Sequence, residues 1–484
     1  MNSIGILGAG LSGVLMGIRL RQAGLDDFTI YEKQPDVGGT WLRNTYPGLH
    51  CDVPSHLYCY SFEPNEWSMV FSGQAEIQAY LRDVAEKYDL IDNIRFGVDV
   101  AAAHYNEPAG TWTLELADGE EVKHRVLVQA TGGLAEPRFP RIDGLETFEG
   151  PLWHSGSWRH DVDLAGKRVA VVGSAASAVQ IVPAAAETAA EVFVFSRSPN
   201  WVMPRRNARY TAEQKLALQS HEEWMRLRRR QYRSTLLVYR AFKKQEAAIR
   251  KLRGIGLQNM QSAIDDPHLI EKLTPDFDPG CKRVLVSDDY YPALAQNHVH
   301  LIDQGVKALT KTEVVANDGS VTPVDTVIFC TGYGVGNRAG GRAALEVYGR
   351  DGQEMLRTLA EKPESYRGVA IPGYPNYFTM CGINGVVAYA SLFQSAELDS
   401  DYITGWIQRL IDENLRSVEA EPDKTHTYSE GIQAELQEMS WAGNCTNFYK
   451  NAAGRILAFY PGTLGRMRRE LSEQHEDDFI LESF

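Results

Sequence analysis

A strand, a glycine-rich turn and a helix follow one another twice in this chain, and this repeated pattern restricts the fold more than any other feature. The first copy begins "IGILGAGLSGVLMGIRL" at Ile4, and the second begins "RVAVVGSAASAVQIV" at Arg168. In each copy a second apolar run, "FTIYEK" or "VFVFSR", follows the helical stretch. That order is typical of a βαβ unit in a parallel sheet. We therefore predict an α/β protein with two Rossmann-like units.

The first turn fits the pattern G-x-G-x-x-G, with Gly8, Gly10 and Gly13. Such glycines allow a tight turn, the close approach of a pyrophosphate and close packing of helix on strand, and the positive helix end faces the phosphates. Glu32 lies 24 residues after Gly8, where a carboxylate can accept hydrogen bonds from both hydroxyls of an adenosine ribose. This unit is predicted to bind FAD or NAD, whose adenosine ribose has a free 2′-hydroxyl.

The second turn reads Gly173, Ala175 and Ala178, and Arg197 stands where the first unit has its glutamate. A guanidinium binds a 2′-phosphate through a forked, charge-assisted contact, whereas a glutamate repels it. The difference predicts NADP in the second unit, although an ordinary surface arginine that ends a strand would look the same. Ala175 places a methyl group where the pyrophosphate comes closest, which predicts looser binding or slightly shifted phosphates.

Charge and hydropathy exclude several classes of partner for these 484 residues. The formal net charge is −14, and phosphate binding needs clustered Lys and Arg, so we expect neither nucleic acid nor an anionic membrane as a partner. One basic stretch, "RLRRRQYR" at residues 226–233, is predicted to be a solvated helix face. No apolar run reaches the roughly 18 residues of a membrane helix, and the start does not read as a signal peptide. A cytoplasmic protein is expected.

Six cysteines are spread along the chain without a C-x-x-C pair. They are Cys51, Cys59, Cys281, Cys330, Cys381 and Cys445. This spacing predicts reduced thiols and no metal site. It also argues against a pyridine-nucleotide disulfide reductase, which needs a redox-active cysteine pair beside its flavin.

Residues 205–278 are charged and favour helix, which predicts a helical insertion in the second unit. Two further strands end on Thr-Gly, as expected where the chain crosses between dinucleotide domains: "RVLVQATGG" at residues 125–133 and "DTVIFCTGY" at residues 325–333. We predict a discontinuous first domain at 1–149 and 333–484. The second domain is predicted at 150–204 and 279–332, on either side of the insertion.

After the first unit, "GGTWLRNTYPGLHCD" resembles the long motif of Baeyer–Villiger monooxygenases, [A/G]-G-x-W-x4-[F/Y]-P-[G/M]-x3-D. The matching positions are Gly38, Gly39, Trp41, Tyr46, Pro47, Gly48 and Asp52. "FEGPLWHSGSWR" resembles the second family motif, with His154 and Trp158 in place and Arg159 as a departure at its last position. "GCKRVLVSDDYYPAL" resembles the segment whose lysine and arginine serve the nicotinamide phosphate and the flavin, here Lys282 and Arg283.

The resemblance continues nearly to the end of the chain. "PGYPNYF" and "GIN" resemble P-G-F-P-N-x-F and G-P-N of the family, with Ile383 in place of proline and Asn384 retained near the expected flavin. "GNCTNFYKNAAGRILAFYPG" resembles the substrate-side tail of one branch, with Phe448 where that branch usually has tryptophan. These departures leave the substrate open.

The resemblance implies an FAD-dependent, NADPH-consuming enzyme that inserts one oxygen atom of O2 into a ketone through a C4a-peroxyflavin, giving an ester or lactone. A cation that keeps the peroxide deprotonated would be the pivotal group. Arg283, oriented by the Asp52 carboxylate, is the expected one. His154 is expected to be structural, and Trp41 and Tyr58 are expected to pack in the flavin region.

The expected cofactor contacts follow from both lines of reasoning. For FAD they are Gly8, Gly10, Gly13, Glu32, Gly39, Thr40, Trp41, Asp52, Tyr58 and Asn384, and for NADP(H) they are Gly173, Ser174, Ser177, Gln180, Arg197, Ser198 and Lys282. Two alternatives remain: a monooxygenase of the same fold acting on an amine or sulfide, and a flavin-binding regulatory module that senses NADPH without turnover. The oligomeric state is not predicted.

Overall fold

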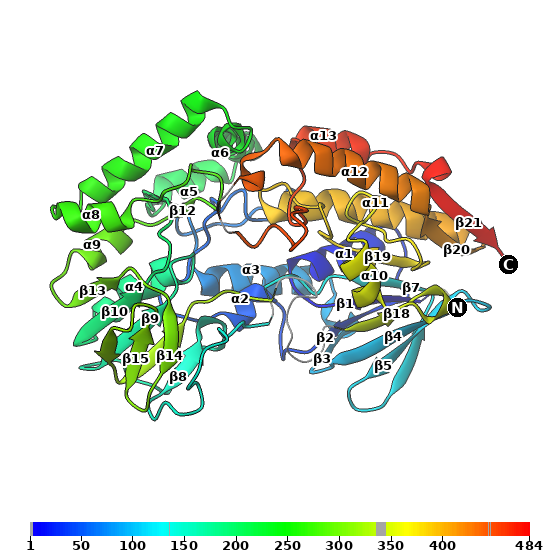
Figure 1. The fold of residues 1–484 in the computed structure, drawn as a ribbon. Coiled ribbons are helices and arrows are strands. Elements are labelled where there is room, and N and C mark those ends of the chain that lie inside the picture. The colour runs from blue at the N-terminus through cyan, green and yellow to red at the C-terminus, as the bar shows by residue number, and fades with distance from the viewer. Residues whose placement is uncertain (1–2, 135, 335–344, 444, 446) are drawn as a thin grey trace.

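Two five-stranded parallel sheets organise the computed structural model, which describes residues 3–134, 136–334, 345–443, 445 and 447–484. Their orders are β19-β7-β1-β2-β3 and β13-β10-β9-β17-β8. In Figure 1 the first sheet lies in the right-hand lobe and the second in the left-hand lobe. The predicted α/β fold with two parallel sheets is confirmed.

The first sheet is built around the N-terminal strand. Its strands are β1 (Ile4–Leu7), β2 (Phe28–Glu32), β3 (Ile94–Phe96), β7 (Val126–Gln129) and β19 (Tyr377–Thr379). All four residues of β1 are buried, as expected for a central parallel strand covered on both faces. Because β19 pairs with β7, the chain returns to this sheet after it has built the second one. Helix α1 (Leu11–Gln22) connects β1 to β2.

The second sheet repeats the plan. Its strands are β8 (Leu152–His154), β9 (Arg168–Val172), β10 (Glu191–Phe195), β13 (Val299–Ile302) and β17 (Thr326–Phe329). Helix α4 (Ala178–Ala186) connects β9 to β10, and α9 (Tyr290–Leu294) packs against α4. The arrangement places both glycine turns at the carboxyl ends of central strands, where ligands bind in open α/β sheets.

Smaller sheets flank the two large ones. They are β4 (Val100–Asn106), β5 (Thr111–Leu116) and β6 (Glu121–His124) with β18 (Glu346–Tyr348); β14 (Val306–Leu309), β15 (Glu313–Ala316) and β16 (Val321–Pro323); and β20 (Leu415–Ala420) with β21 (Phe479–Ser483).

Residues between two short paired strands form the helical insertion. The chain leaves at β11 (Val202–Met203) and returns at β12 (Leu285–Val286), and these strands pair in parallel. Between them lie α5 (Ala212–Leu218), α6 (His221–Phe242), α7 (Glu246–Gln261) and α8 (Pro267–Leu273). α7 packs on β11, so the insertion is anchored where it begins.

The basic stretch of α6 is only partly the solvated face that we predicted. Arg226 does face solvent, where it pairs with Glu222 and Glu223. Arg228, however, is 6% exposed, and its guanidinium lies over the Trp224 ring and donates to a backbone carbonyl at residue 56. The prediction fails at Arg228 because its neighbours come from the first domain, which the local sequence does not show.

The remaining helices lie mainly over the first sheet. They are α2 (Thr40–Arg43), α3 (Gln74–Lys87), α10 (Met355–Glu361), α11 (Leu392–Asp412), α12 (Pro422–Gln437) and α13 (Leu464–Glu470). α11 packs against α1 and contributes to the largest apolar core.

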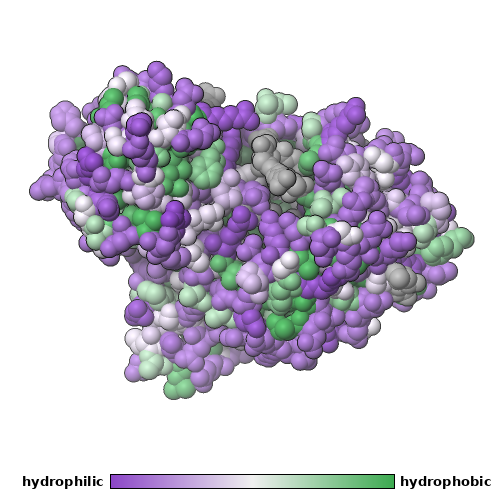
Figure 2. Space-filling model, turned by 90° about the horizontal axis from the view of Figure 1, so that it is seen from below, coloured by the Kyte–Doolittle hydropathy of each residue, from purple (hydrophilic) through white to green (hydrophobic). Residues whose placement is uncertain are grey.

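The face drawn in Figure 2 is mostly hydrophilic, and its apolar patches are small and separated. Within the part of the chain that the structure describes, no helix combines the length and apolarity needed to cross a bilayer.

Candidate active site

The first glycine turn leaves almost no room for side chains. Gly8 has a φ of +102°, and a Cβ atom on Gly13 would lie 1.8 Å from the Gly8 carbonyl oxygen. A Cβ atom on Gly39 would lie 3.0 Å from the Cα atom of Gly10, so these two backbones approach each other closely. α1 begins directly after Gly10, so unpaired N–H groups of its first turn face this bare backbone. The turn therefore fits a phosphate group.

Glu32 ends β2 beside this turn and is 6% exposed. Its Oε2 accepts the Ala9 N–H at 2.7 Å, and its Oε1 accepts the Gln34 N–H at 2.8 Å. These bonds fix the carboxylate, and each oxygen can still accept another hydrogen bond. The site therefore fits an adenosine ribose with two free hydroxyls.

The second glycine turn is also tight at its first position. Gly173 has a φ of +135°, and a Cβ atom there would lie 2.3 Å from the Cys330 carbonyl oxygen. Ser174 donates its hydroxyl to the Ser198 carbonyl at 2.7 Å, which joins the turn to the segment after β10. Ala175 is exposed, so its methyl group lies on the surface that a nucleotide would approach.

Helix α4 contacts the loop of the long motif. Gln180 accepts the His50 N–H at 2.7 Å and donates its amide to a carbonyl four residues earlier. Gly48 has a φ of +76°, and a Cβ atom there would lie 2.7 Å from the Gln180 carbonyl oxygen. The Ser177 hydroxyl lies beside Tyr46. The side-chain oxygen of Gln180 thus contacts the first unit, and its amide nitrogen is bonded within its own unit.

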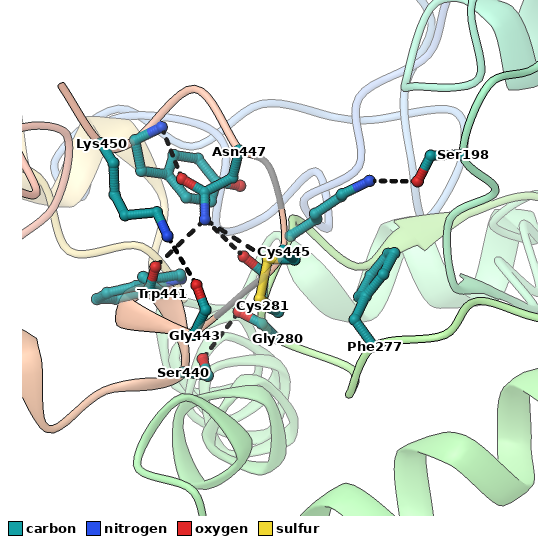
Figure 3. The surroundings of a disulfide bond; sticks show 12 residues. Ser198, Phe277, Gly280, Cys281, Ser440, Trp441, Gly443, Cys445, Asn447 and Lys450 are labelled. Atoms are coloured by element: carbon teal, nitrogen blue, oxygen red, sulfur yellow. Dashed lines mark hydrogen bonds between the residues drawn. A yellow bond between two sulfur atoms is a disulfide. The ribbon is translucent and has the colours of Figure 1, made fainter. Parts of the chain in front are cut away.

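Two cations lie close together: Arg197, which follows β10, and Lys282. Lys282 donates from Nζ to the Ser198 hydroxyl at 2.7 Å, and its ammonium lies 4.5 Å from the centre of the Phe277 ring (Figure 3). Burial lowers the pKa of Lys282, and the positive charge of Arg197 lowers it further while Asp276 opposes the shift. Among the residues that the structure describes, neither cation has a carboxylate oxygen within 4.0 Å. Such a pair fits a phosphate dianion.

Arg283 forms a fork with Asp52. Its Nε and Nη2 donate to the two carboxylate oxygens at 2.6 and 2.7 Å. The Arg283 side chain is 50% exposed and that of Asp52 is 28% exposed, so part of the guanidinium surface stays accessible. The Asp52 charge raises the pKa of Arg283, and the guanidinium stays positive at any pH at which the protein is folded.

Tyr449 stands beside this ion pair, and the sequence reasoning missed it. Burial raises the pKa of Tyr449 to about 12, and the nearby Arg283 opposes the shift. The only signal in the sequence was its place in the segment that resembles a substrate-side tail.

Trp41 and Tyr58 pack against each other. Trp41 donates its indole N–H to the Tyr58 hydroxyl at 3.0 Å, and the rings meet edge to face with centroids 5.5 Å apart. Tyr58 also meets the Phe393 ring of α11 at 4.9 Å. Thr40 is exposed at the start of α2. Their contact with a flavin stays a prediction.

Asn384 has a φ of +56°, and its side chain is used by the protein itself. The Nδ2 group donates to the Ile456 and Phe459 carbonyls at 2.9 and 2.8 Å, and the Oδ1 atom accepts from Gln433 at 3.2 Å. This residue therefore ties the tail to the turn after β19. A contact with flavin here would use its backbone.

His154 is fully buried, and its Nδ1 accepts the Gly156 N–H at 3.0 Å. Its ring packs edge to face against Phe139 and Tyr333. Burial lowers the pKa of His154 to about 4, so the ring is neutral near pH 7. These contacts fit the expected structural role.

The prediction that all six cysteines are reduced is wrong. Cys281 and Cys445 form a disulfide, with Cα atoms 6.2 Å apart and a sequence separation of 164 residues (Figure 3). The tail folds back on the loop that precedes Lys282, so long-range folding rather than local spacing brings these cysteines together. The other four cysteines are free thiols.

A cluster of possible metal ligands lies elsewhere, at Glu364, His426 and Glu430, with one ligand atom from each within 4.8 Å of the others. Arg455 pairs with Glu430 at 2.5 Å and lies 3.9 Å from Glu364. Because this arginine already balances the carboxylates, we assign no metal to the cluster.

The chain is similar to known proteins over nearly its whole length. A family model described as flavin-binding monooxygenase-like matches residues 1–337. A Baeyer–Villiger monooxygenase of Streptomyces coelicolor is 36% identical over 471 residues, covering 96% of this chain and 90% of that protein. The crystal structure of OTEMO in complex with FAD and NADP has a TM-score of 0.87 and 25% identity, with 99% of both chains covered. Cyclohexanone monooxygenase from Rhodococcus sp. Phi1 bound to NADP+ has a TM-score of 0.87 and 26% identity, covering 100% of this chain and 99% of that one.

Proposed function

The chain belongs to the Baeyer–Villiger branch of the flavin-binding monooxygenase-like family, and from this premise we propose that it oxygenates a ketone with O2 to give an ester or lactone. FAD and NADPH are its cofactors, as in the OTEMO complex. The observation that carries the proposal is the fork between Arg283 and Asp52, two residues that lie far apart in sequence and were both expected at the flavin.

The two units divide the cofactors between them. The bare turn at Gly8 and Gly13 and the fixed Glu32 carboxylate support FAD in the first unit. The cations of Arg197 and Lys282 support NADPH in the second unit. Among the described residues neither cation has a carboxylate oxygen within 4.0 Å, and a 2′-phosphate would supply the negative charge to pair with them. We propose domain boundaries accordingly: an FAD domain at 1–149 and 333–484, and an NADP domain at 150–204 and 279–332, with the helical insertion at 205–278.

When bound, FAD supplies the redox and oxygen chemistry, and the protein must orient the reactants and control charge. Arg283 provides a permanent positive charge and N–H donors for an anionic oxygen. Asp52 uses both carboxylate oxygens to hold the guanidinium in one orientation. Tyr449 stays protonated near pH 7 and can donate a hydrogen bond beside the same cation.

Oxygenation of an amine or sulfide is the second candidate, and the departures at Arg159 and Ile383 from the family motifs favour it. The first of these departures lies on the surface. Arg159 pairs with Asp161, and their side chains are 47% and 65% exposed. Such a pair contributes little to a distant pocket. A location in the cytoplasm stays a prediction, and the oligomeric state stays open.

Steady-state turnover with a panel of ketones, sulfides and amines tests the proposal. We expect NADPH oxidation to rise on addition of a ketone, with an ester or lactone as the product. Exclusive formation of N- or S-oxides would instead identify the protein as a monooxygenase that acts on amines or sulfides. Bound FAD without any substrate-dependent turnover would instead support a regulatory module.

A further inference from the structure

The disulfide between Cys281 and Cys445 connects two segments that are far apart in sequence and lie beside the candidate active site. Cys281 directly precedes Lys282 and Arg283, which point to the proposed nucleotide and flavin sites. Cys445 belongs to the tail of the first domain, a few residues before Tyr449. Figure 3 shows the two segments joined at this bond. The crosslink therefore lies one residue from Lys282 and two residues from Arg283.

Few other bonds hold the two segments together. Ser440 donates its hydroxyl to the Gly280 carbonyl at 2.8 Å, and Asn447 donates to the Cys281 carbonyl at the longer distance of 3.3 Å. Tyr449 of the tail also interacts with the backbone of Arg283. These contacts are all noncovalent, so the disulfide is the strongest link between the segments.

The position of the loop that carries Cys281 decides where Lys282 and Arg283 lie. Lys282 spans from this loop to Ser198 in the second unit, and Arg283 spans from it to Asp52 in the first. A shift at residue 281 is transmitted to both contacts, because the two residues follow it directly along the backbone.

We propose that Cys281–Cys445 is a thiol–disulfide exchange site, and that its redox state sets how firmly the enzyme holds NADPH. The inference rests on the proposed roles of Lys282 and Arg283. In the disulfide form the loop is fastened to the tail and the cations are preorganised. In the dithiol form the covalent link is lost, and noncovalent contacts, among them the hydrogen bonds of Gly280 and Cys281, hold the loop to the tail.

The exchange needs a dithiol as the reductant. Cys281 is 5% exposed and Cys445 is half-buried, so the more accessible sulfur is that of Cys445. A thiolate of the reductant attacks this sulfur, the Cys281–Cys445 bond breaks, and a mixed disulfide forms at Cys445 while Cys281 leaves as a thiolate and takes a proton. The second thiolate of the reductant then releases Cys445. Two electrons and two protons pass to the protein, and the reductant becomes a disulfide.

Dithiothreitol tests the site on the folded holoenzyme. Alkylation followed by mass spectrometry is expected to find Cys281 and Cys445 crosslinked before treatment and alkylated after it. Loosening of the cations should raise the Kd for NADP+ and the KM for NADPH about fivefold, equivalent to about 1 kcal/mol. The kcat should change less, because saturating NADPH restores the bound state.

Matched variants separate the crosslink from other effects of the reductant. The double variant Cys281→Ser/Cys445→Ser should bind NADP+ as weakly as the reduced enzyme and should not respond to dithiothreitol. Cys59→Ser removes a buried free thiol instead and should keep the full response. The double variant's thermal unfolding, measured alongside, distinguishes a folded enzyme with weak nucleotide binding from an unfolded one.

Three results would overturn the proposal. They are free thiols at both positions before treatment, a bond that folded enzyme does not exchange with dithiothreitol, and an opened bond with an unchanged Kd for NADP+. Failure of the proposed function looks different: Lys282→Ala would then leave NADPH binding unchanged, whatever the alkylation pattern.

Discussion

Replacing Lys282 by methionine should reduce the preference for NADPH over NADH. Methionine keeps the length of the side chain and much of its contact with the Phe277 ring, but it removes the charge and the bond to Ser198. A hydrogen bond to a charged group contributes about 1.5–3 kcal/mol, which corresponds to roughly 10- to 150-fold in kcat/KM. Lys282 is half-buried and Arg197 is exposed, so we expect the lysine to account for the larger share.

The assay compares kcat/KM for NADPH and NADH in the wild type and the variant. The value for NADPH should fall by at least about tenfold and the value for NADH should change little, because only NADPH carries the 2′-phosphate. Lys311→Met is the matched control, since it removes the same charge from an exposed ion pair with Glu149. A variant that retains its NADPH preference to within about threefold would refute the assignment of this cation pair.

Three further predictions test other parts of the site. Arg283→Lys keeps the positive charge but loses the fork to Asp52, so lactone formation should fall by about 10²- to 10³-fold. NADPH oxidation should continue, with hydrogen peroxide as the product in place of the lactone. Equal losses of lactone formation and NADPH oxidation would contradict this role. Gly13→Ala places its methyl group against the Gly8 carbonyl, so the purified protein should lack flavin absorbance, whereas a normal FAD content would disprove the tight turn. His154 has its pKa lowered to about 4 by burial, so the unfolded state binds a proton more readily than the folded state between pH 6.5 and 4. Its contribution to stability is therefore complete above pH 6.5 and is lost as the pH falls to 4, by up to about 3 kcal/mol, and His154→Gln should flatten the pH dependence of the unfolding free energy.

Local patterns in the sequence were enough to predict both phosphate turns and the residues at the strand ends. Gly8, Glu32 and Arg197 each stand at a fixed offset within a βαβ unit, and the backbone of such a unit sets where they lie. The Arg283–Asp52 contact joins segments far apart in the chain, and it was expected only because both motifs resemble those of one family.

Features that depend on the docking of distant segments could not be predicted in this way. The disulfide between Cys281 and Cys445 has no local spacing signal. Arg228 looked like one of several exposed arginines, yet a carbonyl from the first domain binds it in the interior. Asn384 was expected near a flavin, and the sequence does not show that its side-chain amide binds carbonyl groups of the tail. In each case the partner is supplied by tertiary packing.

The pairing of β11 with β12 has a consequence for how this enzyme can change. Because the chain departs and comes back at adjacent strands, helices α5 to α8 can be lengthened, shortened or exchanged without altering the register of either parallel sheet. Lys282 and Arg283 lie within three residues of the start of the returning strand, so the β11–β12 pair keeps these cations in place when the helices vary. The helical insertion can therefore diversify in evolution while the positions of the two cations are preserved.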